Sequence, residues 1–596
     1  MTTWQQLRDV RLSEYEDAAD GWGKISGRAN AAKDRVDNEM LGTLRETQKG
    51  ETATGATADL SRLSRNYQYI HTECGLIRTA LNGLAAELAA PQKKLKQALE
   101  DAENRRFTVR PDGSVEYPVS AVVPLAPGRG TATPGAPVPL LPGRAEGGAD
   151  PNKADAEDIA ERIAGAVGEA AEIDGRYAGV LRALKTTGGL DVTDAMLADA
   201  AQDTRALREA AGKYADASAI PQGKSAADNA SWWNGLTQEQ RDEYATLYPA
   251  EVGALDGIPS DVRDDANRMV LAETRAQAQL SLDGLGPEPP KMLKDPNGGP
   301  YAVSMLNPAW STWDKTRTRL QAQIKGMDAI QKRFDAPPSS GLPPAFLLGF
   351  DTKGNGHAII ANGNPDTADH TAVYVPGTTS KLGGIGGDID RMTELWKEAN
   401  SQAPGKSVST ITWLGYNAPQ SIVPEAMQKQ WAYDGSPKLN SFMDGLEATQ
   451  GGPAGSHTTV IGHSYGSTVV GDASNKGDLS ADDIVVAGSP GMMAAEAGDL
   501  DVGKDHVWSE AAGDDLVPLG GKAAGLGGFK WGVQTWNGIP YNPGYIQTVP
   551  SDEAFGAHRM DVDTSGHSNY WKRDSLSLKN QAAVVVGHYA DVKEDD

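Results

Sequence analysis

Ser464 stands between two glycines in the stretch VIGHSYGS, in the order G-x-S-x-G. A serine that attacks an acyl carbon must project from a sharp turn at the end of a strand, with a helix after it. The apolar, β-branched run HTTVIG leads into this turn, STVVGDAS can open a helix after it, and Gly462 and Gly466 keep the turn free of side chains. Ser464 is therefore a candidate nucleophile.

A motif of this length often occurs by chance, so its meaning depends on partners elsewhere in the chain. A nucleophilic serine needs a histidine as general base and a carboxylate that orients the imidazole, and after such a turn they follow in the order Ser, Asp, His. The stretch GDDLVP supplies Asp515, with Asp514 as the alternative acid, and TSGHSNYW supplies His567. The three residues lie about 50 positions apart, which leaves room for one strand and one helix per step. This pattern predicts acyl transfer through a covalent intermediate on Ser464.

The chain has nine histidines, and chain order selects among them. Six precede the acid, namely His71, His357, His370, His457, His463 and His506. His558 and His588 follow it, but their contexts, AFGAHRM and VVVGHYADV, favour a structural role. His567, in a Gly/Ser loop, is the predicted base.

Two backbone N–H donors must stabilise the oxyanion that forms during acyl transfer. The first is the amide of Tyr465, directly after the nucleophile. The second is expected in AVYVPGTTSKLGG, where Gly377 lets the chain turn close to the acyl oxygen, so we predict the amide of Thr378. The glycines of KLGGIGGD lack the lysine of a phosphate-binding loop and predict a mobile loop at the rim of the site. The reaction needs neither a metal nor a cofactor.

Length and composition limit the class of protein. A chain of 596 residues exceeds what one core supports, so about two to four domains are expected. No run approaches the roughly 20 apolar residues of a membrane helix, and a formal net charge of -24 makes nucleic acid a poor partner. The N-terminal stretch MTTWQQLRDVRLSEYEDAADGW mixes charges throughout, which predicts a cytoplasmic protein. Cys74, the single cysteine, excludes an internal disulfide and is expected to be a small core residue.

Periodicity divides the chain into a helical part and an α/β part. Between Leu60 and Leu88 the apolar residues alternate spacings of three and four, which is typical of a coiled-coil seam. Asp112-Gly113, between alternating apolar residues, predicts a β-hairpin. Beyond residue 340, seven short β-rich runs alternate with helical or loop stretches, which predicts a mostly parallel sheet flanked by helices. The expected domains are a helical hairpin or bundle over 1–105, a β-hairpin over 106–120, a Pro/Gly linker over 121–153, a helical region over 154–340 and the α/β domain over 341–596.

Several ordered motifs resemble an actinobacterial α/β-hydrolase family catalogued as a domain of unknown function. They are VPGTTS (375–380), WLGYNAP (413–419), VIGHSYGS (460–467), VVAGSPGM (485–492), GDDLVP (513–518) and GHSNYW (566–571). The likeness covers about residues 340–596, and it implies an α/β-hydrolase fold with Ser464, Asp515 and His567 as the catalytic triad. It implies no particular substrate.

Two further segments look like known neighbours of this domain. WWNGL and LDGIPSDVRDDANR, residues 232–236 and 255–268, are similar to the helical segment that often precedes it in the same family. The turn at Trp22-Gly23 is similar to that of small W-x-G proteins exported by a leaderless specialised secretion system, although the order here is W-G. Export by that route is the alternative to a cytoplasmic location.

These observations predict a serine hydrolase that acts on a carboxylic ester or similar acyl bond. We expect a small or medium acyl group, because no long apolar insertion that could form a large lid interrupts the strands. The alternative is an interaction protein whose helices bind a partner or a second copy, with an inactive or accessory hydrolase domain. The long heptad stripe supports that alternative.

Overall fold

The computed structural model describes residues 3–41, 43–44, 48, 50–119, 129–134, 150–184, 191–294, 304–337, 340–477, 479–536 and 539–595. Most of the predicted linker over 121–153 lies outside these residues. The chain divides into two compact units, the first made of residues 1–31, 67–190 and 199–219 and the second of residues 32–66, 191–198 and 220–596. The domain boundaries expected from the sequence stay predictions.

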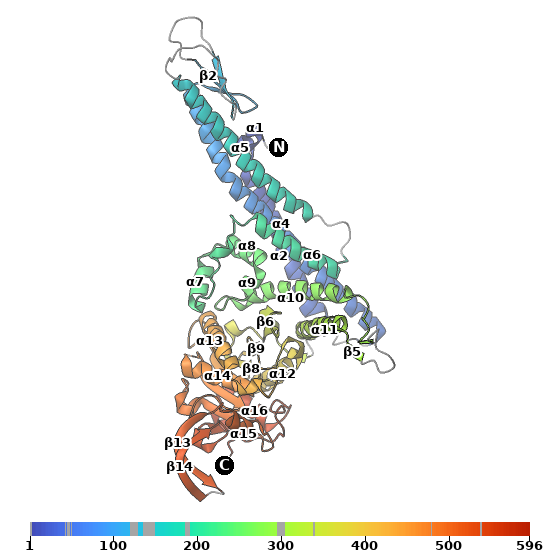
Figure 1. Ribbon diagram of the computed structural model, residues 1–596, viewed down its shortest axis with the longest axis vertical. Coiled ribbons are helices and arrows are strands. Elements are labelled where there is room, and N and C mark those ends of the chain that lie inside the picture. The colour runs from blue at the N-terminus through green and yellow to red at the C-terminus, as the bar shows by residue number, and fades with distance from the viewer. Residues whose placement is uncertain are drawn as a thin grey trace. The chain divides into compact units, whose positions relative to one another are not determined.

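Long helices make up most of the first unit. They are α1 (Trp4–Asp9), α2 (Leu12–Asp34), α4 (Glu51–Asn104), α5 (Pro151–Ala183) and α6 (Asp194–Ala210), of which α2, α4 and α6 also contribute residues to the second unit. Helix α4 continues through Pro91, and α5 runs antiparallel beside it (Figure 1). Ion pairs join their facing surfaces, among them Lys94 with Glu169 and Arg162 with Asp101, each at 2.7 Å.

The interior of the first unit confirms two local predictions. Cys74 is buried in α4, and burial raises the pKa of its thiol to about 11. The hairpin at Asp112-Gly113 is present as β1 (Thr108–Val109) paired antiparallel with β2 (Val115–Pro118), which pairs in turn with β3 (Arg129–Ala132). The hydroxyl of Tyr177 on α5 donates to Glu87 of α4 at 2.7 Å, so a polar contact lies within this helix pair.

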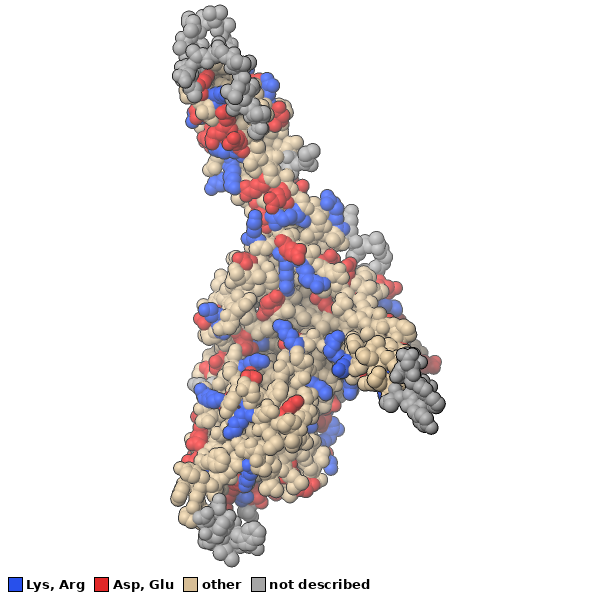
Figure 2. Space-filling model, in the orientation of Figure 1, with Lys and Arg blue, Asp and Glu red and all other residues tan. Residues whose placement is uncertain are grey.

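The second unit begins with helices and small strands and continues into a large sheet. The π-helix η1 (Arg35–Leu41) comes first, and the elements that precede the sheet are α7 (Ala226–Gly235), α8 (Gln238–Leu247), α9 (Pro249–Gly253), α10 (Ser260–Asp283), β4 (Met292–Lys294), β5 (Ser304–Leu306) and α11 (Pro308–Phe334). In the part of the chain that the structure describes, no helix is long and apolar enough to cross a membrane. Acidic and basic side chains are interspersed on the face shown in Figure 2.

All seven β-rich runs predicted beyond residue 340 form strands of one sheet. They are β6 (Ala345–Asp351), β7 (His357–Asn362), β8 (His370–Val375), β9 (Val408–Leu414), β10 (His457–His463), β11 (Asp483–Ala487) and β12 (Val507–Glu510), and β15 (His558–Arg559) completes an eight-stranded sheet. The strand order is β15-β12-β11-β10-β8-β9-β7-β6. Strands β6 and β7 pair antiparallel, and the remaining strands run parallel to one another. The predicted α/β class is confirmed.

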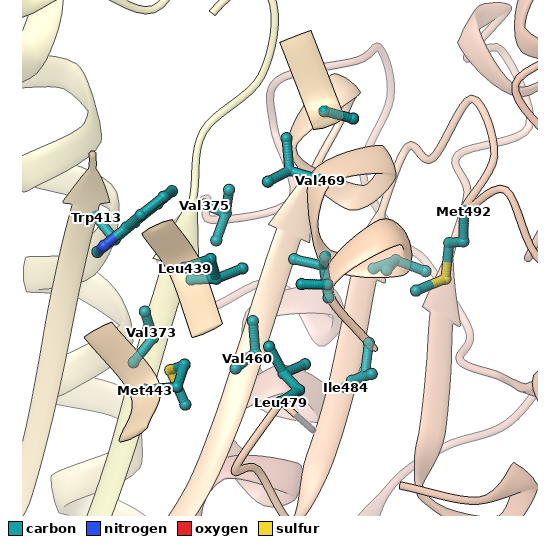
Figure 3. Close-up of a cluster of buried hydrophobic side chains, with 14 of the residues drawn as sticks. Val373, Val375, Trp413, Leu439, Met443, Val460, Val469, Leu479, Ile484 and Met492 are labelled. Atoms are coloured by element: carbon teal, nitrogen blue, oxygen red, sulfur yellow. The ribbon is translucent and has the colours of Figure 1, made fainter. Parts of the chain in front are cut away.

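Helices cover both faces of this sheet. They are α12 (Ile385–Gln402), α13 (Gln430–Gln450), α14 (Tyr465–Lys476) and α16 (Leu576–Val585), and the short helix α15 (Val517–Ala524) follows β12 in the chain. Because side chains alternate along a strand, Val460 of β10 packs with the α13 and α14 side, whereas the next residue, Ile461, packs with the α12 and α16 side. Figure 3 shows Val460 near Leu439 and Met443, and Ile484 beside Leu479, in the first of these two cores.

One hairpin of the second unit was not predicted from the sequence. Strands β13 (Gly528–Trp536) and β14 (Ile539–Thr548) pair antiparallel outside the main sheet. Phe529, Trp531 and Tyr545 on this hairpin are exposed. Their alternation with polar residues and glycines was a usable signal for a ribbon with one apolar face.

Candidate functional site

Ser464 occupies the turn between β10 and α14 in a backbone conformation that few residues adopt. Its φ is 53° and its ψ is -130°, and such a conformation in a residue other than glycine costs about 1–3 kcal/mol. Hydrogen bonds on both sides hold it there. The amide of Ser464 donates to the carbonyl of Ala487 at 3.0 Å, and its own carbonyl accepts the amide of Ser467 at 3.0 Å. The turn therefore has the strained strand-to-helix geometry expected around a nucleophilic serine.

The two glycines that flank Ser464 are required by space. A Cβ atom on Gly462 would lie 2.6 Å from the Cα atom of Ser467, and a Cβ atom on Gly466 would lie 2.1 Å from the carbonyl oxygen of Val375. Both neighbours are backbone atoms, which can move only if the main chain shifts. This packing agrees with the expectation from the sequence that Gly462 and Gly466 keep the turn free of side chains.

Asp515 and His567 meet although 51 residues of chain lie between them. The Nδ1 atom of His567 lies 2.8 Å from Oδ2 of Asp515. Asp515 also accepts the hydroxyl of Tyr570 at 2.7 Å and the amide of Val517 at 2.9 Å. Burial opposes ionisation of Asp515, but these three donors together hold the pKa of its carboxyl below its ordinary value. An ionised Asp515 fixes the tautomer in which Nδ1 carries the proton.

The alternative acid, Asp514, has a different contact. Its Oδ1 atom accepts the amide of Gly566 at 2.7 Å, so it anchors the loop immediately before His567 and does not contact the imidazole. Gly488, after β11, packs against the pair: a Cβ atom there would lie 2.7 Å from Oδ2 of Asp515. The choice between the two acids thus favours Asp515 on geometry.

His463, which chain order excludes as the base, lies directly beside His567. Its Nε2–H donates to the backbone carbonyl of His567 at 2.8 Å, and the two rings stack with centroids 4.8 Å apart. His463 is buried, and burial, followed by the nearby positive charge of Arg391, lowers its pKa to about 3. A neutral imidazole therefore supports the backbone of the predicted base.

Tyr570 and His463 are the site residues that sequence reasoning missed. Both stand inside motifs already singled out, GHSNYW and GHSYG. The pair of aromatic residues Tyr570 and Trp571, three and four positions after the base, was the available signal for a buried hydroxyl donor. Nothing in the motif around Ser464 indicates that its histidine contacts the loop of His567.

The predicted oxyanion donors lie around the same turn. Tyr465 is the first residue of α14, so its amide has no acceptor within the helix. A Cβ atom on Gly377 would lie 2.6 Å from Cβ of Ser464 and 2.9 Å from the amide nitrogen of Tyr465, which brings the loop of Thr378 against the nucleophile. The hydroxyl of Tyr416 donates to the carbonyl of Pro376 at 2.7 Å and holds this loop in place.

One cavity of about 830 Å³ joins these groups, since Ser464, Tyr465, His567 and Thr378 all line it. Of the nine histidines, all within the described residues, His463 and His567 are the two at this cavity. Among the described residues there is no hydrogen bond between Ser464 and the ring of His567. Catalytic contacts of this kind are often long without a substrate and tighten when one binds.

The prediction of a mobile loop at KLGGIGGD is wrong in part. Gly384, Gly387 and Asp388 do line the cavity, but the segment forms the 3₁₀ turn η5 (Leu382–Gly384) and the first turn of α12. Gly383 serves close packing, because a Cβ atom there would lie 3.0 Å from the carbonyl of Ala322 on α11. A contact between segments 61 residues apart is invisible in a local pattern.

Comparisons with known proteins agree with this architecture. A family model described as alpha/beta hydrolase matches residues 351–521. An uncharacterized protein of Mycobacterium tuberculosis is 31% identical over 387 residues, which cover 62% of this chain and 56% of the relative. An uncharacterized protein of Mycobacterium bovis is 29% identical over 185 residues, which cover 29% of this chain and 68% of the relative.

The chain thus spans a little over half the length, 56%, of the first of these relatives. No solved structure matches it significantly. The eight-stranded, mostly parallel sheet, the turn at Ser464 and the family match over residues 351–521 support one assignment. The chain contains an alpha/beta hydrolase domain, preceded by a helical N-terminal region.

Proposed function

We propose that the chain is a serine hydrolase that cleaves a carboxylic ester or related acyl bond through an acyl-enzyme on Ser464. The observation that carries this proposal is that a strained serine and His567 line one cavity, and that Asp515 pairs with His567. A structural serine has no need of a backbone conformation that costs free energy, nor of a histidine at the same cavity that is paired with a carboxylate.

In the proposed reaction, His567 takes the proton of the Ser464 hydroxyl as its oxygen attacks the acyl carbon. The amides of Tyr465 and Thr378 donate to the oxyanion of the tetrahedral intermediate. His567 then gives the proton to the departing alkoxide, and the acyl group stays on Ser464. Water, deprotonated by His567, attacks the acyl-enzyme in the same way and releases the acid. Asp515 stabilises the imidazolium that forms in each half.

Covalent labelling tests this proposal on the full chain. A fluorophosphonate probe should label the wild type, and Ser464→Ala and His567→Ala should each abolish labelling while their circular dichroism spectra stay unchanged. Ser568→Ala is the matched control, because this serine also lines the cavity but lies outside the proposed triad. It should label at the wild-type rate.

Failure to label would contradict the catalytic proposal. If the folded wild type does not react, the hydrolase domain is inactive toward this chemistry. Interaction through the N-terminal helices, the alternative expected from the heptad stripe, would then be the function to test by measuring self-association and partner binding.

A further inference from the structure

Part of the cavity wall is mainly apolar. Two segments provide it, residues 422–427 after β9 and residues 516–526, which include α15. The apolar side chains among them are Ile422, Val423, Ala426, Met427, Leu516, Val517, Ala523, Ala524 and Leu526. Such a wall contacts hydrocarbon favourably and offers no hydrogen bonds to a polar group.

The charged side chains at this cavity neutralise each other. Among the described residues, those that line it are Asp388 and Arg391. The Nη1 atom of Arg391 lies 2.8 Å from Oδ1 of Asp388, and it also donates to the hydroxyl of Tyr374 at 2.8 Å. Since the ion pair is internal, the cavity provides no unbalanced charge to hold an ionic group of a substrate.

The apolar wall continues to the protein surface. Ile422, Val423 and Leu516 line the cavity and yet are 75%, 69% and 75% exposed. Large apolar side chains that are both exposed and grouped at the opening of a cavity mark a route for an apolar ligand. A chain of methylene groups that extends from Ser464 towards this opening would cover them.

The size of the cavity decides between short and long acyl groups. A volume of about 830 Å³ lies in the upper part of the range, roughly 300–1,000 Å³, in which proteins hold drug-sized molecules. An acetyl group would leave most of the apolar wall in contact with water. Each further methylene that leaves water for this wall strengthens binding about fourfold.

We propose that the preferred substrates are uncharged esters of long-chain carboxylic acids, with acyl chains of about ten carbons or more. The acyl chain lies against the cavity-lining residues of segments 422–427 and 516–526, with its carbonyl at Ser464. This inference rests on the proposed function of Ser464. It differs from the small or medium acyl group expected from the sequence, because two short segments that meet only in the fold build the apolar wall.

Chain-length selectivity tests the inference. The full-length protein is assayed with acetyl, butyryl, octanoyl and dodecanoyl nitrophenyl esters, each below its critical micelle concentration. The value of kcat/KM should rise by roughly tenfold or more from the acetyl to the dodecanoyl ester, since the added methylenes contact the apolar wall. A maximum at acetyl or butyryl would overturn the inference.

Variants that fill the cavity distinguish the contribution of its wall to kcat/KM from the contribution of the catalytic groups. Ala426→Trp and Ala524→Trp narrow it from the two opposite segments, and both alanines are half-buried and line it. Each should reduce kcat/KM for the dodecanoyl ester by roughly tenfold more than kcat/KM for the acetyl ester. Leu519→Trp, at an exposed position of α15 that does not line the cavity, is the control and should leave the profile unchanged.

The outcomes distinguish this inference from the proposed function. Labelling of Ser464 by the fluorophosphonate, together with equal losses for all esters in both alanine variants, would overturn the acyl-chain inference alone. Absence of both labelling and ester hydrolysis would overturn the proposed function. Labelling of each variant at the wild-type rate shows that it is folded, and the two variants give independent readings if one of them fails to fold.

Discussion

At the scale of single residues, the hydrogen bonds of Asp515 decide how well the predicted triad is organised. Tyr570 is fully buried, and its hydroxyl donates to Asp515 at 2.7 Å while accepting the amide of Ala512 at 3.0 Å. It therefore links the carboxylate to the loop that carries it. Because Tyr570 touches Asp515 and does not line the cavity, it is a positioning residue.

We predict that Tyr570→Phe lowers kcat/KM by about tenfold, because it leaves the buried amide of Ala512 without its acceptor and removes one donor from Asp515. Hydrogen bonds to the ionised form lower the pKa of a carboxyl, so their loss raises the pKa of Asp515. The acid limb of the pH–rate profile should then move to higher pH, which steady-state assays will detect. A lower rate with an unmoved acid limb would contradict the positioning role.

His463 links the site to the pH dependence of stability. Its pKa is lowered from 6.5 to about 3, so the folded protein keeps it neutral while the unfolded chain protonates it below about pH 6.5. The stabilisation is complete above pH 6.5 and is lost as the pH falls towards 3. We predict that the free energy of unfolding of the wild type falls by about 2 kcal/mol more than that of His463→Gln between pH 7 and pH 5.

Urea unfolding followed by tryptophan fluorescence measures this difference. Glutamine keeps an N–H donor for the carbonyl of His567 but does not titrate. The variant therefore removes the protonation of residue 463 and keeps its hydrogen bond. Equal losses of stability in the two proteins would show that His463 does not control the acid sensitivity.

At the scale of elements, the parallel strands bring the predicted groups together. Ser464 follows β10, Asp515 follows β12 and His567 follows β15, and the carboxyl ends of parallel strands share one edge of a sheet. The contact of Gly466 with Val375 of β8 shows how tightly the turn fits against the neighbouring strand.

We predict that Gly466→Ala slows fluorophosphonate labelling by about a hundredfold or more, because its Cβ atom would lie 2.1 Å from a backbone oxygen and would displace the turn. Gly498→Ala is the control, since no atom lies within 4 Å of a Cβ atom at that position. Labelling rates and thermal midpoints should be measured together. A normal labelling rate in a folded Gly466→Ala protein would show that the turn tolerates the shift.

At the scale of the whole molecule, the net charge of -24 acts on approaching substrates. Acidic and basic side chains are interspersed on the face shown in Figure 2, but acidic residues outnumber basic ones by 80 to 56. A field of this sign repels polyanionic substrates and has no effect on uncharged ones.

We therefore predict that kcat/KM for a long-chain acyl-coenzyme A thioester rises several-fold as sodium chloride is increased, because salt screens the repulsion. The value for an uncharged ester of the same acyl chain should stay constant. Steady-state assays at low and high ionic strength compare the two. A fall for the thioester with salt would indicate a local basic surface that attracts phosphate groups.

The sequence by itself determined the α/β class, the seven predicted strands and the position of Ser464 between strand and helix, because periodicity and glycine spacing act over a few neighbouring residues. The same local logic did not find the start of α12 within KLGGIGGD, because packing of Gly383 against α11 is not visible in a local pattern. Chain order also indicated Asp515 and His567 as the acid and the base. It could not show that their side chains meet.

Only the tertiary structure decided which side chains meet. The contact of Asp515 with His567, the anchoring role of Asp514 and the hydrogen bond from His463 to the loop of His567 each join segments more than 50 residues apart. The apolar wall of the cavity likewise comes from residues 422–427 and 516–526. Such contacts depend on how strands and helices pack, so no pattern of neighbouring residues specifies them.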